Sequence, residues 1–306
     1  MTVGPHVTYV LVDAAGGRYA AMAYLSVAAL RRVHPGACIT LVCDPPTAAA
    51  VPGFRFPLRG LVDELRAEPA DMPHPRARSF YLKTRLRDLL AGDFAYLDCD
   101  TLPVRPFADV FDRPFDLALV QDRNHHGPVR PVFPEWERPR MKAMGWEYPL
   151  ARYFNAGVMY VRDTPAARAV AADWQARWHF SYARGDDWDQ LALSCAIHTT
   201  PAAVAELPPA YNAMVSVHPA LARGAKVLHV TVGNSLVGDD TLFGHLLRHL
   251  DATGDVDWPT LDRCVARDYP WVGPDWAYRL WHTGNRRRAV VRAVAGRLAR
   301  LMGGRP

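Results

Sequence analysis

The 306-residue sequence predicts an α/β protein with a mixed sheet flanked by helices and a helical C-terminal extension. Apolar runs of strand length alternate with segments of helical periodicity from residue 6 onward. The runs at 6–13 and 37–44 lack polar alternation, as expected of strands that are buried on both faces. No stretch reaches 18 consecutive apolar residues, so the sequence predicts no membrane span.

The N-terminal region predicts a β-α-β unit. The first strand, HVTYVLVD at 6–13, is followed by a segment with apolar residues at helical spacing: Ala21, Tyr24, Leu25, Ala28 and Ala29. Pro35-Gly36 ends this helix, and ACITLVCD at 37–44 forms the second strand. A right-handed crossover of this kind predicts parallel pairing of the two strands.

The same alternation continues through the rest of the chain. Residues 123–150, in which prolines, arginines and tryptophans crowd together, are interpreted as an irregular excursion. The further predicted strands are 94–98, 115–122, 153–163 and 225–231. The further predicted helices are 81–92, 164–178 and 186–198, followed by a helical, tryptophan-rich remainder.

Cysteine usage and the N-terminus favour a cytoplasmic protein. The five cysteines form no C-x-x-C pair and their number is odd, so we expect reduced thiols. The N-terminus enters a strand pattern without a basic segment before an apolar core, so we predict no signal peptide. Eight arginines and no acidic residue follow Asp275. Since the whole chain has a net charge of +5, residues 1–275 carry a net charge of −3. We expect no nucleic-acid partner.

Five aspartates follow predicted strands, at the point where each strand ends: Asp13, Asp44, Asp98, Asp100 and Asp122. In open α/β sheets, ligands bind beyond the carboxyl ends of the strands. Carboxylates gathered there repel one another unless a positive charge lies among them. Oxygen ligands suit Mn²⁺ or Mg²⁺, which also bind substrate phosphates, so Asp98-x-Asp100 predicts a metal–diphosphate site. The alternative is structural, because aspartate commonly ends strands and starts turns.

Five blocks between residues 7 and 235 resemble glycosyltransferase family 8, which includes bacterial lipopolysaccharide galactosyltransferases and glycogenin. In the family's order they are VTYVLVDAAGGRYAAMAYLSVAALRRVHP, YLKTRLRDLLAGDFAYLDCDTLPV, YFNAGVMYV, WDQLAL and VLHVTVG. The resemblance implies a GT-A fold, which is a Rossmann-like mixed sheet flanked by helices. It also implies that 1–235 form the nucleotide-sugar-binding catalytic domain and 236–306 a helical extension.

The resemblance further implies a reaction and the residues that perform it. A hexose would pass from a nucleoside-diphosphate sugar, expected to be a UDP-hexose, to a hydroxyl group with retention of configuration. The acceptor would be a glycan, a glycolipid or a small molecule. Asp98, Asp100 and His229 would hold Mn²⁺ (or Mg²⁺), and Asp189 and Gln190 would act in catalysis. The implied donor-binding residues are Asp13, Tyr19, Lys83, Asp98, Asp122 and Asn155.

The chain departs from the family's pattern after His229. The family usually has a glycine and then Lys-Pro-Trp, with the lysine on the diphosphate, whereas this chain reads HVTVGNSLVG. Diphosphate binding is therefore expected to rely on the metal, on backbone N–H groups near 233–235, or on an arginine from elsewhere.

Two other functions share parts of this pattern. A sugar-1-phosphate nucleotidyltransferase would have a similar sheet and acidic metal site, but it requires a glycine-rich basic loop after the first strand. The sequence offers Gly16-Gly17-Arg18 without the lysine that should follow. The second alternative is a non-catalytic nucleotide-sugar-binding protein, because of the departure after His229.

The C-terminal segment 285–302 predicts a basic amphipathic helix. At 100° per residue its apolar side chains fall within about 120° of arc: Val290, Val291, Val294, Leu298, Leu301 and Met302. Arginines occupy most of the remaining surface, which suits an anionic lipid surface. We therefore expect peripheral attachment to a membrane. The alternatives are docking on the protein's own acidic surface or a disordered tail.

Overall fold

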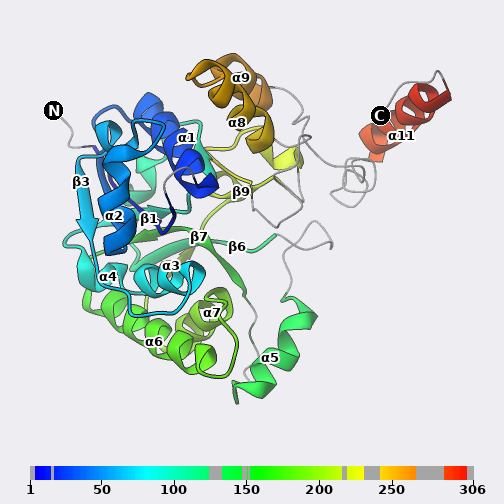
Figure 1. The fold of residues 1–306 in the computed structure, drawn as a ribbon. Coiled ribbons are helices and arrows are strands. Elements are labelled where there is room, and N and C mark those ends of the chain that lie inside the picture. The colour runs from blue at the N-terminus through cyan, green and yellow to red at the C-terminus, as the bar shows by residue number, and fades with distance from the viewer. Residues whose placement is uncertain are drawn as a thin grey trace.

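The structure is a computed structural model that describes residues 4–14, 17–123, 133–146, 150, 152–215, 219–230, 242–266 and 286–301. Helices and strands alternate along the chain, and the strands form two sheets (Figure 1). The strands are β1 (His6–Leu11), β2 (Cys38–Cys43), β3 (Glu64–Ala67), β4 (Phe94–Leu97), β5 (Thr101–Pro103), β6 (Leu117–Gln121), β7 (Phe154–Val161), β8 (Val204–Glu206), β9 (Ala213–Met214) and β10 (Val227–His229). The helices are α1 (Arg18–Val33), α2 (Pro45–Ala50), α3 (Pro75–Thr84), α4 (Leu86–Leu89), α5 (Arg138–Ala143), α6 (Pro165–Tyr182), α7 (Gln190–Thr199), α8 (Leu242–Thr253), α9 (Trp258–Ala266) and α11 (Arg286–Leu301).

The larger sheet is mixed and has seven strands in the order β3-β2-β1-β4-β7-β6-β8. β3, β2, β1 and β4 pair in parallel, which confirms the predicted β-α-β crossover. β7 runs antiparallel to both β4 and β6. The smaller sheet has the order β5-β10-β9, and the segment 98–100 joins β4 directly to β5. The two sheets therefore meet at the carboxyl end of β4.

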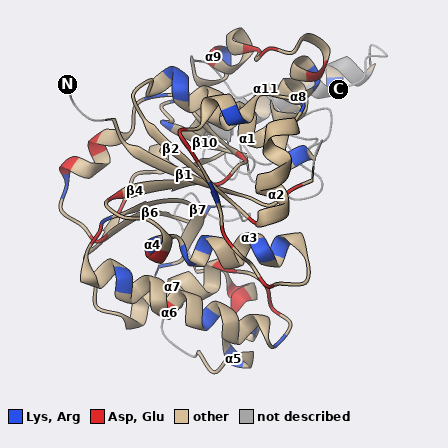
Figure 2. Cartoon of the chain, turned by 60° about the vertical axis from the view of Figure 1, so that its left-hand side comes forward, with Lys and Arg blue, Asp and Glu red and all other residues tan. Residues whose placement is uncertain are grey.

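Both faces of the larger sheet are buried. Along β4, Phe94 and Tyr96 enter the core beneath α3, α6 and α7, while Ala95 and Leu97 enter the core beneath α1. This double burial explains the uninterrupted apolar runs. The strands β1, β2, β4, β6 and β7 contain no charged side chain. Among the described residues, charged side chains lie on the edge strands β3 and β8 and on helices and loops (Figure 2). In the middle of the sheet, charged groups therefore lie beyond the strand ends or come from helices that cover the sheet.

In the C-terminal extension, α8 and α9 pack on α1 and the smaller sheet. Phe243 and Leu246 of α8 share one buried cluster with Met22 and Leu25 of α1. Among the described residues, no helix is both long and apolar enough to cross a bilayer. The predicted domain boundary at 235 lies outside the described residues.

Two sequence predictions of local structure were wrong. Within the predicted irregular excursion, 135–137 form a 3-10 turn that continues into α5. Pro139 lies in the first turn of α5, where a backbone N–H would have no hydrogen-bond partner within the helix. Proline is therefore tolerated there, and the many prolines of this segment wrongly indicated a loop. The helix predicted over 81–92 is two helices, α3 and α4, separated at Arg85.

Candidate functional site

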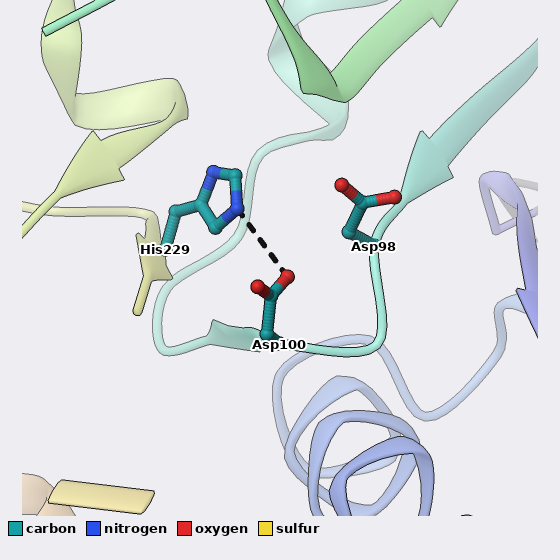
Figure 3. A group of neighbouring side chains, drawn as sticks. All are labelled: Asp98, Asp100 and His229. Atoms are coloured by element: carbon teal, nitrogen blue, oxygen red, sulfur yellow. Dashed lines mark ion pairs between the residues drawn. The ribbon is translucent and has the colours of Figure 1, made fainter. Parts of the chain in front are cut away.

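Asp98, Asp100 and His229 lie together where the two sheets meet (Figure 3). Asp98 follows β4, Asp100 precedes β5, and His229 ends β10, directly opposite Thr101 of β5. One ligand atom from each side chain lies within 4.8 Å of the other two. Nε2 of His229 is 3.3 Å from Oδ1 of Asp100. The fold thus brings together the three predicted metal ligands.

Backbone hydrogen bonds hold the segment that carries the two aspartates. The carbonyl of Asp98 accepts from the backbone N–H of Thr101 at 3.1 Å and from its hydroxyl at 2.8 Å. The carbonyl of Asp100 accepts from the N–H of Val230 at 3.0 Å, which links it to the end of β10. The positions of the two carboxylates are therefore set by the turn and by the strand pairing.

Gly157 leaves room for this group. A Cβ atom at position 157 would lie 2.3 Å from Cε1 of His229 and 2.8 Å from Oδ2 of Asp98. The backbone carbonyl of Gly157 also accepts from the N–H of Asp98 at 2.8 Å. Only glycine fits here, because any side chain would occupy the space next to both candidate ligands.

The pairing of β7 with β6 is irregular next to the site. Leu119 of β6 pairs with Met159, so a regular antiparallel ladder would place Gln121 opposite Gly157. Gln121 instead pairs with Phe154, so residues 155–157 lie outside the ladder with β6. Irregularities of this kind commonly redirect side chains near functional sites.

The side-chain amide of Asn155 has a fixed orientation. A backbone N–H can only donate, so the atom 2.9 Å from the Gly157 nitrogen is Oδ1 of Asn155. Nδ2 of Asn155 lies at the other end and donates to Oδ1 of Asp122 at 3.1 Å. Both contacts give the same orientation of the Asn155 amide. Its oxygen can therefore accept a hydrogen bond from a second donor.

That second donor orients His229. Nδ2 of Asn212 donates to Oδ1 of Asn155 at 2.9 Å, which leaves Oδ1 of Asn212 facing Nδ1 of His229 at 2.9 Å. Nδ1 must therefore carry the proton, and Nε2 is the nitrogen that faces Asp100. A metal-binding histidine commonly has this arrangement, with the non-ligating nitrogen donating to an oxygen.

The electrostatics of the group favour a cation. Burial acts to lower the pKa of His229, but the Asp100 and Asp98 carboxylates outweigh burial and raise it. Burial raises the pKa of Asp98, against the opposing effect of Lys83. Carboxylates and an imidazole nitrogen suit Mn²⁺ or Mg²⁺, and the missing side chain of Gly157 lets His229 and Asp98 lie close enough to share such an ion.

Lys83 links the metal-ligand group to the start of α7. Its Nζ is 3.5 Å from Oδ1 of Asp98 and 3.0 Å from Oδ2 of Asp189. Burial acts to lower the pKa of Lys83, but these two carboxylates outweigh burial and raise it, so the side chain stays charged. The Tyr96 hydroxyl also hydrogen-bonds Asp98.

Gln190 lies on the opposite side of Asn155 from Asn212. Its Oε1 accepts from Nδ2 of Asn155 at 3.2 Å and from the N–H of Ala156 at 3.3 Å. Asp122, Asn155 and Gln190 are thus joined to the metal-ligand group through hydrogen bonds, and Asp189 is joined to it through the two ion pairs of Lys83. These residues come from the ends of β6 and β7 and from the start of α7.

Asp13 and Asp44 are positioned differently. The Asp13 carboxylate accepts from the backbone N–H groups of Ala14 and Ala20, at 2.8 and 2.9 Å, at the start of α1. The Asp44 carboxylate caps α2 through the N–H of Thr47 and pairs with Arg78. Neither joins the metal-ligand group formed by the described residues. Both carboxylates thus act at helix starts, and the implied contact of Asp13 with the donor stays a prediction.

Tyr19 borders the group from α1 and is 50% exposed. Burial and then Asp100 raise the pKa of Tyr19, while Arg76 and Arg18 oppose that shift, so two guanidinium groups also lie near it. The expected backbone contacts at 233–235 lie outside the described residues.

Three residues of the site were not predicted from the sequence: Tyr96, Gly157 and Asn212. Tyr96 and Gly157 lie inside the quoted blocks, where strand alternation and the glycine of Phe154-Asn155-Ala156-Gly157 were available as signals. Asn212 precedes the two-residue strand β9 and carries no local signal, because its role depends on β9 pairing with β10.

Comparison with known proteins supports the fold. No protein-family model and no curated protein matches the chain. Among solved structures, the WbbM bifunctional glycosyltransferase has a TM-score of 0.56 at 14% identity, over 87% of this chain and 52% of that one. The galactosyltransferase LgtC, in complex with donor and acceptor sugar analogs, has a TM-score of 0.55 at 16% identity, over 82% and 96%. GlyE of Streptococcus pneumoniae has a TM-score of 0.54 at 13% identity, over 88% and 65%. The chain thus spans about half of WbbM, and its mixed sheet flanked by helices is the GT-A fold of glycosyltransferases.

Proposed function

We propose that this protein is a metal-dependent glycosyltransferase that moves a hexose from a nucleoside-diphosphate sugar to a hydroxyl group of an acceptor. The observation that carries the proposal is the group formed by Asp98, Asp100 and His229, with Nε2 of His229 directed to the carboxylates. The group lies at the strand ends of a GT-A fold, where such sheets bind ligands. LgtC, which shares this fold, was solved with donor and acceptor sugar analogs.

In this proposal, Asp98, Asp100 and His229 hold Mn²⁺ (or Mg²⁺), and the donor is a UDP-hexose. A bound cation of this kind stabilises negative charge on a departing diphosphate. Lys83 adds a buried positive charge next to Asp98, and fixed charges in a desolvated site stabilise developing charge strongly. Arg18 or Arg76 takes the role of the family's missing lysine.

The residues around Asn155 would face the transferred sugar. Asp189 and Gln190 act near the anomeric carbon, where an oxocarbenium-like centre requires a nearby carbonyl or carboxylate. Asn155 and Asp122 bind sugar hydroxyl groups, and Tyr19 with Asp13 borders the uracil. We propose retention of anomeric configuration, in line with the family resemblance.

We also propose that α11 attaches the protein to an anionic membrane, where a glycolipid acceptor would lie. Five apolar side chains of α11 are 51–84% exposed: Val290, Val291, Val294, Leu298 and Leu301. Exposed apolar side chains on a helix rich in arginine suit the interface of an anionic bilayer.

A donor panel tests the proposed reaction. UDP- and GDP-hexoses would be incubated with Mn²⁺ and without acceptor, and slow release of the nucleotide would be measured. We expect hydrolysis of at least one UDP-hexose, and Asp100→Asn should abolish the Mn²⁺-dependent gain in UDP affinity while the circular dichroism spectrum stays unchanged. Equal UDP binding in Mn²⁺ and in EDTA would refute the metal site. Binding without turnover of any donor would favour a nucleotide-sugar-binding protein.

A further inference from the structure

The carboxylate of Asp98 receives a hydrogen bond from a buried tyrosine. Tyr96 is 2% exposed, and its hydroxyl donates to Oδ1 of Asp98, two positions further along the chain. Side chains two positions apart in a strand point to the same face of the sheet, so β4 itself brings these two groups together. A carboxylate can only accept, so the hydroxyl is the donor.

Lys83 reaches the same oxygen from α3. Its Nζ is 3.5 Å from Oδ1 of Asp98 and 5.1 Å from the centre of the Tyr96 ring. Tyr96 and Lys83 are thus two donors on one carboxylate oxygen. The other oxygen, Oδ2, accepts no hydrogen bond from any residue that the structure describes.

Oδ2 of Asp98 lies on the side of the other metal ligands. A Cβ atom at Gly157 would be 2.8 Å from Oδ2 of Asp98 and 3.0 Å from Nε2 of His229, so both atoms border the same space. Figure 3 shows one oxygen of Asp98 directed toward His229 and the other directed away from it. The Asp98 side chain is 30% exposed, so an ion from solvent can reach it. The two oxygens therefore have different surroundings, since Oδ1 meets protein donors and Oδ2 faces the candidate ligands.

Packing alone does not require a hydroxyl group at position 96. The other residues of β4 are Phe94, Ala95 and Leu97, which are all apolar and buried. Phenylalanine would fill the same space as Tyr96 without a polar group, whereas a buried hydroxyl without a partner costs free energy. What the hydroxyl adds is direction, because a carboxylate whose Oδ1 is held cannot rotate Oδ2 away from His229.

We propose that Tyr96 is a positioning residue of the metal site: its hydroxyl holds Oδ1 of Asp98 and thereby presents Oδ2 to the ion. The proposal rests on the metal-dependent function proposed above. Tyr96 does not itself bind the ion, because its hydroxyl is engaged by Asp98. Its effect should therefore fall on the affinity for the metal, and on turnover only through the metal.

The binding test uses Tyr96→Phe, which removes one hydroxyl and keeps the ring. We expect the affinity for Mn²⁺, measured by titration calorimetry without nucleotide, to fall about tenfold, as for loss of a group that orients a metal ligand. The loss should not be larger, because Lys83 still contacts Oδ1. The matched control is Tyr160→Phe in β7, which is also buried and whose hydroxyl lies 3.4 Å from the carbonyl oxygen of Tyr211. It should leave the Mn²⁺ affinity unchanged.

A second readout reports on the ligands of the ion rather than on the stability of the fold. The electron paramagnetic resonance spectrum of bound Mn²⁺ depends on the symmetry of its ligands. At saturating Mn²⁺ we expect a changed spectrum in Tyr96→Phe, where the Asp98 carboxylate can turn, and the wild-type spectrum in Tyr160→Phe. Circular dichroism of the metal-free proteins checks that both variants are folded. A purely structural hydroxyl would lower Tm in Tyr96→Phe and leave the Mn²⁺ affinity and the spectrum unchanged.

The results separate this proposal from the function on which it rests. If the wild type binds Mn²⁺ and Tyr96→Phe shows an unchanged affinity or an unchanged spectrum, the positioning role is wrong while the metal site stands. If the wild type binds no Mn²⁺, the metal site is wrong and the role of Tyr96 is wrong with it. If the wild type binds Mn²⁺ but hydrolyses no donor, the transferase function fails, and the comparison of Tyr96→Phe with Tyr160→Phe still decides the positioning role.

Discussion

Asn212 decides which nitrogen of His229 faces the carboxylates, because its own amide is fixed by Asn155. Replacing it with leucine would remove the acceptor for Nδ1–H and free the ring to rotate or change tautomer. We expect Asn212→Leu to weaken Mn²⁺ binding 10- to 100-fold, as for other groups that orient a metal-binding histidine. Titration calorimetry with MnCl₂ in the absence of nucleotide measures this affinity.

The control variant Asn212→Asp keeps an acceptor for Nδ1–H and should bind Mn²⁺ more tightly than the leucine variant. Equal affinity of Asn212→Leu and wild type would remove Asn212 from the site.

Gly157 is a second single-residue determinant, since a methyl group there would lie 2.3 Å from Cε1 of His229. We expect Gly157→Ala to displace the imidazole, to reduce Mn²⁺ affinity by at least about tenfold, and to lower Tm, because overpacking of a filled interior typically costs 1–3 kcal/mol. The control is Gly60→Ala, where the added Cβ meets nothing within 4 Å. If both alanine variants bind Mn²⁺ like wild type, the site is roomier than this geometry indicates.

Among the elements, α8 and α9 are joined by Asp257. Its Oδ2 is 2.8 Å from Nε2 of His245 on α8, and its Oδ1 accepts from the N–H of Thr260 in the first turn of α9. Burial acts to raise the pKa of Asp257, but the hydrogen bonds from His245 and Thr260 outweigh it and lower that pKa to about 2.

A pKa below the unfolded value means that the ionised carboxylate stabilises the folded state, and that this contribution is lost as pH falls from about 4 toward 2. We expect Asp257→Asn to lower the free energy of unfolding in urea by roughly 2 kcal/mol at pH 6, and by much less at pH 3. Asp262→Asn removes an exposed pair with Arg32 and should cost under about 1 kcal/mol at either pH. A deficit in Asp257→Asn that does not change with pH would contradict the assignment.

For the whole molecule, the distribution of charge bears on where the protein acts. Residues 1–275 carry a net charge of −3, while eight arginines follow. An anionic bilayer attracts each nearby arginine by about 1 kcal/mol, so several could hold an acidic body at the surface.

We therefore expect the full-length chain to sediment with anionic vesicles at low salt, and a form ending at Asp275 to remain in the supernatant. Val294→Asp and Leu298→Asp, which place acids on the exposed apolar side of α11, should reduce binding as well. Neutral vesicles and high salt are the controls, since the attraction is screened. If both forms sediment alike, or if lipid charge has no effect, a soluble acceptor becomes the better hypothesis.

The sequence by itself determined the five central strands of the larger sheet, β1, β2, β4, β6 and β7, and the position of the Asp-x-Asp segment. Strands buried on both faces are largely apolar and uncharged, as β1, β2, β4 and β7 are, so their charged neighbours lie beyond their ends. The order of the quoted blocks then indicated Asp98, Asp100 and His229 together, although His229 lies 129 positions after Asp100.

Only the tertiary structure decided which strand-end aspartates share a site. Asp13 and Asp44 interact with the N–H groups at the starts of α1 and α2, and a helix start attracts a carboxylate whether or not a metal is near. Local sequence cannot distinguish these uses. The short strands β3, β5, β8 and β9 were not predicted, because two to four residues become a strand only through pairing with distant segments. Asn212 derives its role from the pairing of β9 with β10, since a hydrogen bond between residues far apart in the chain exists only after the chain has folded.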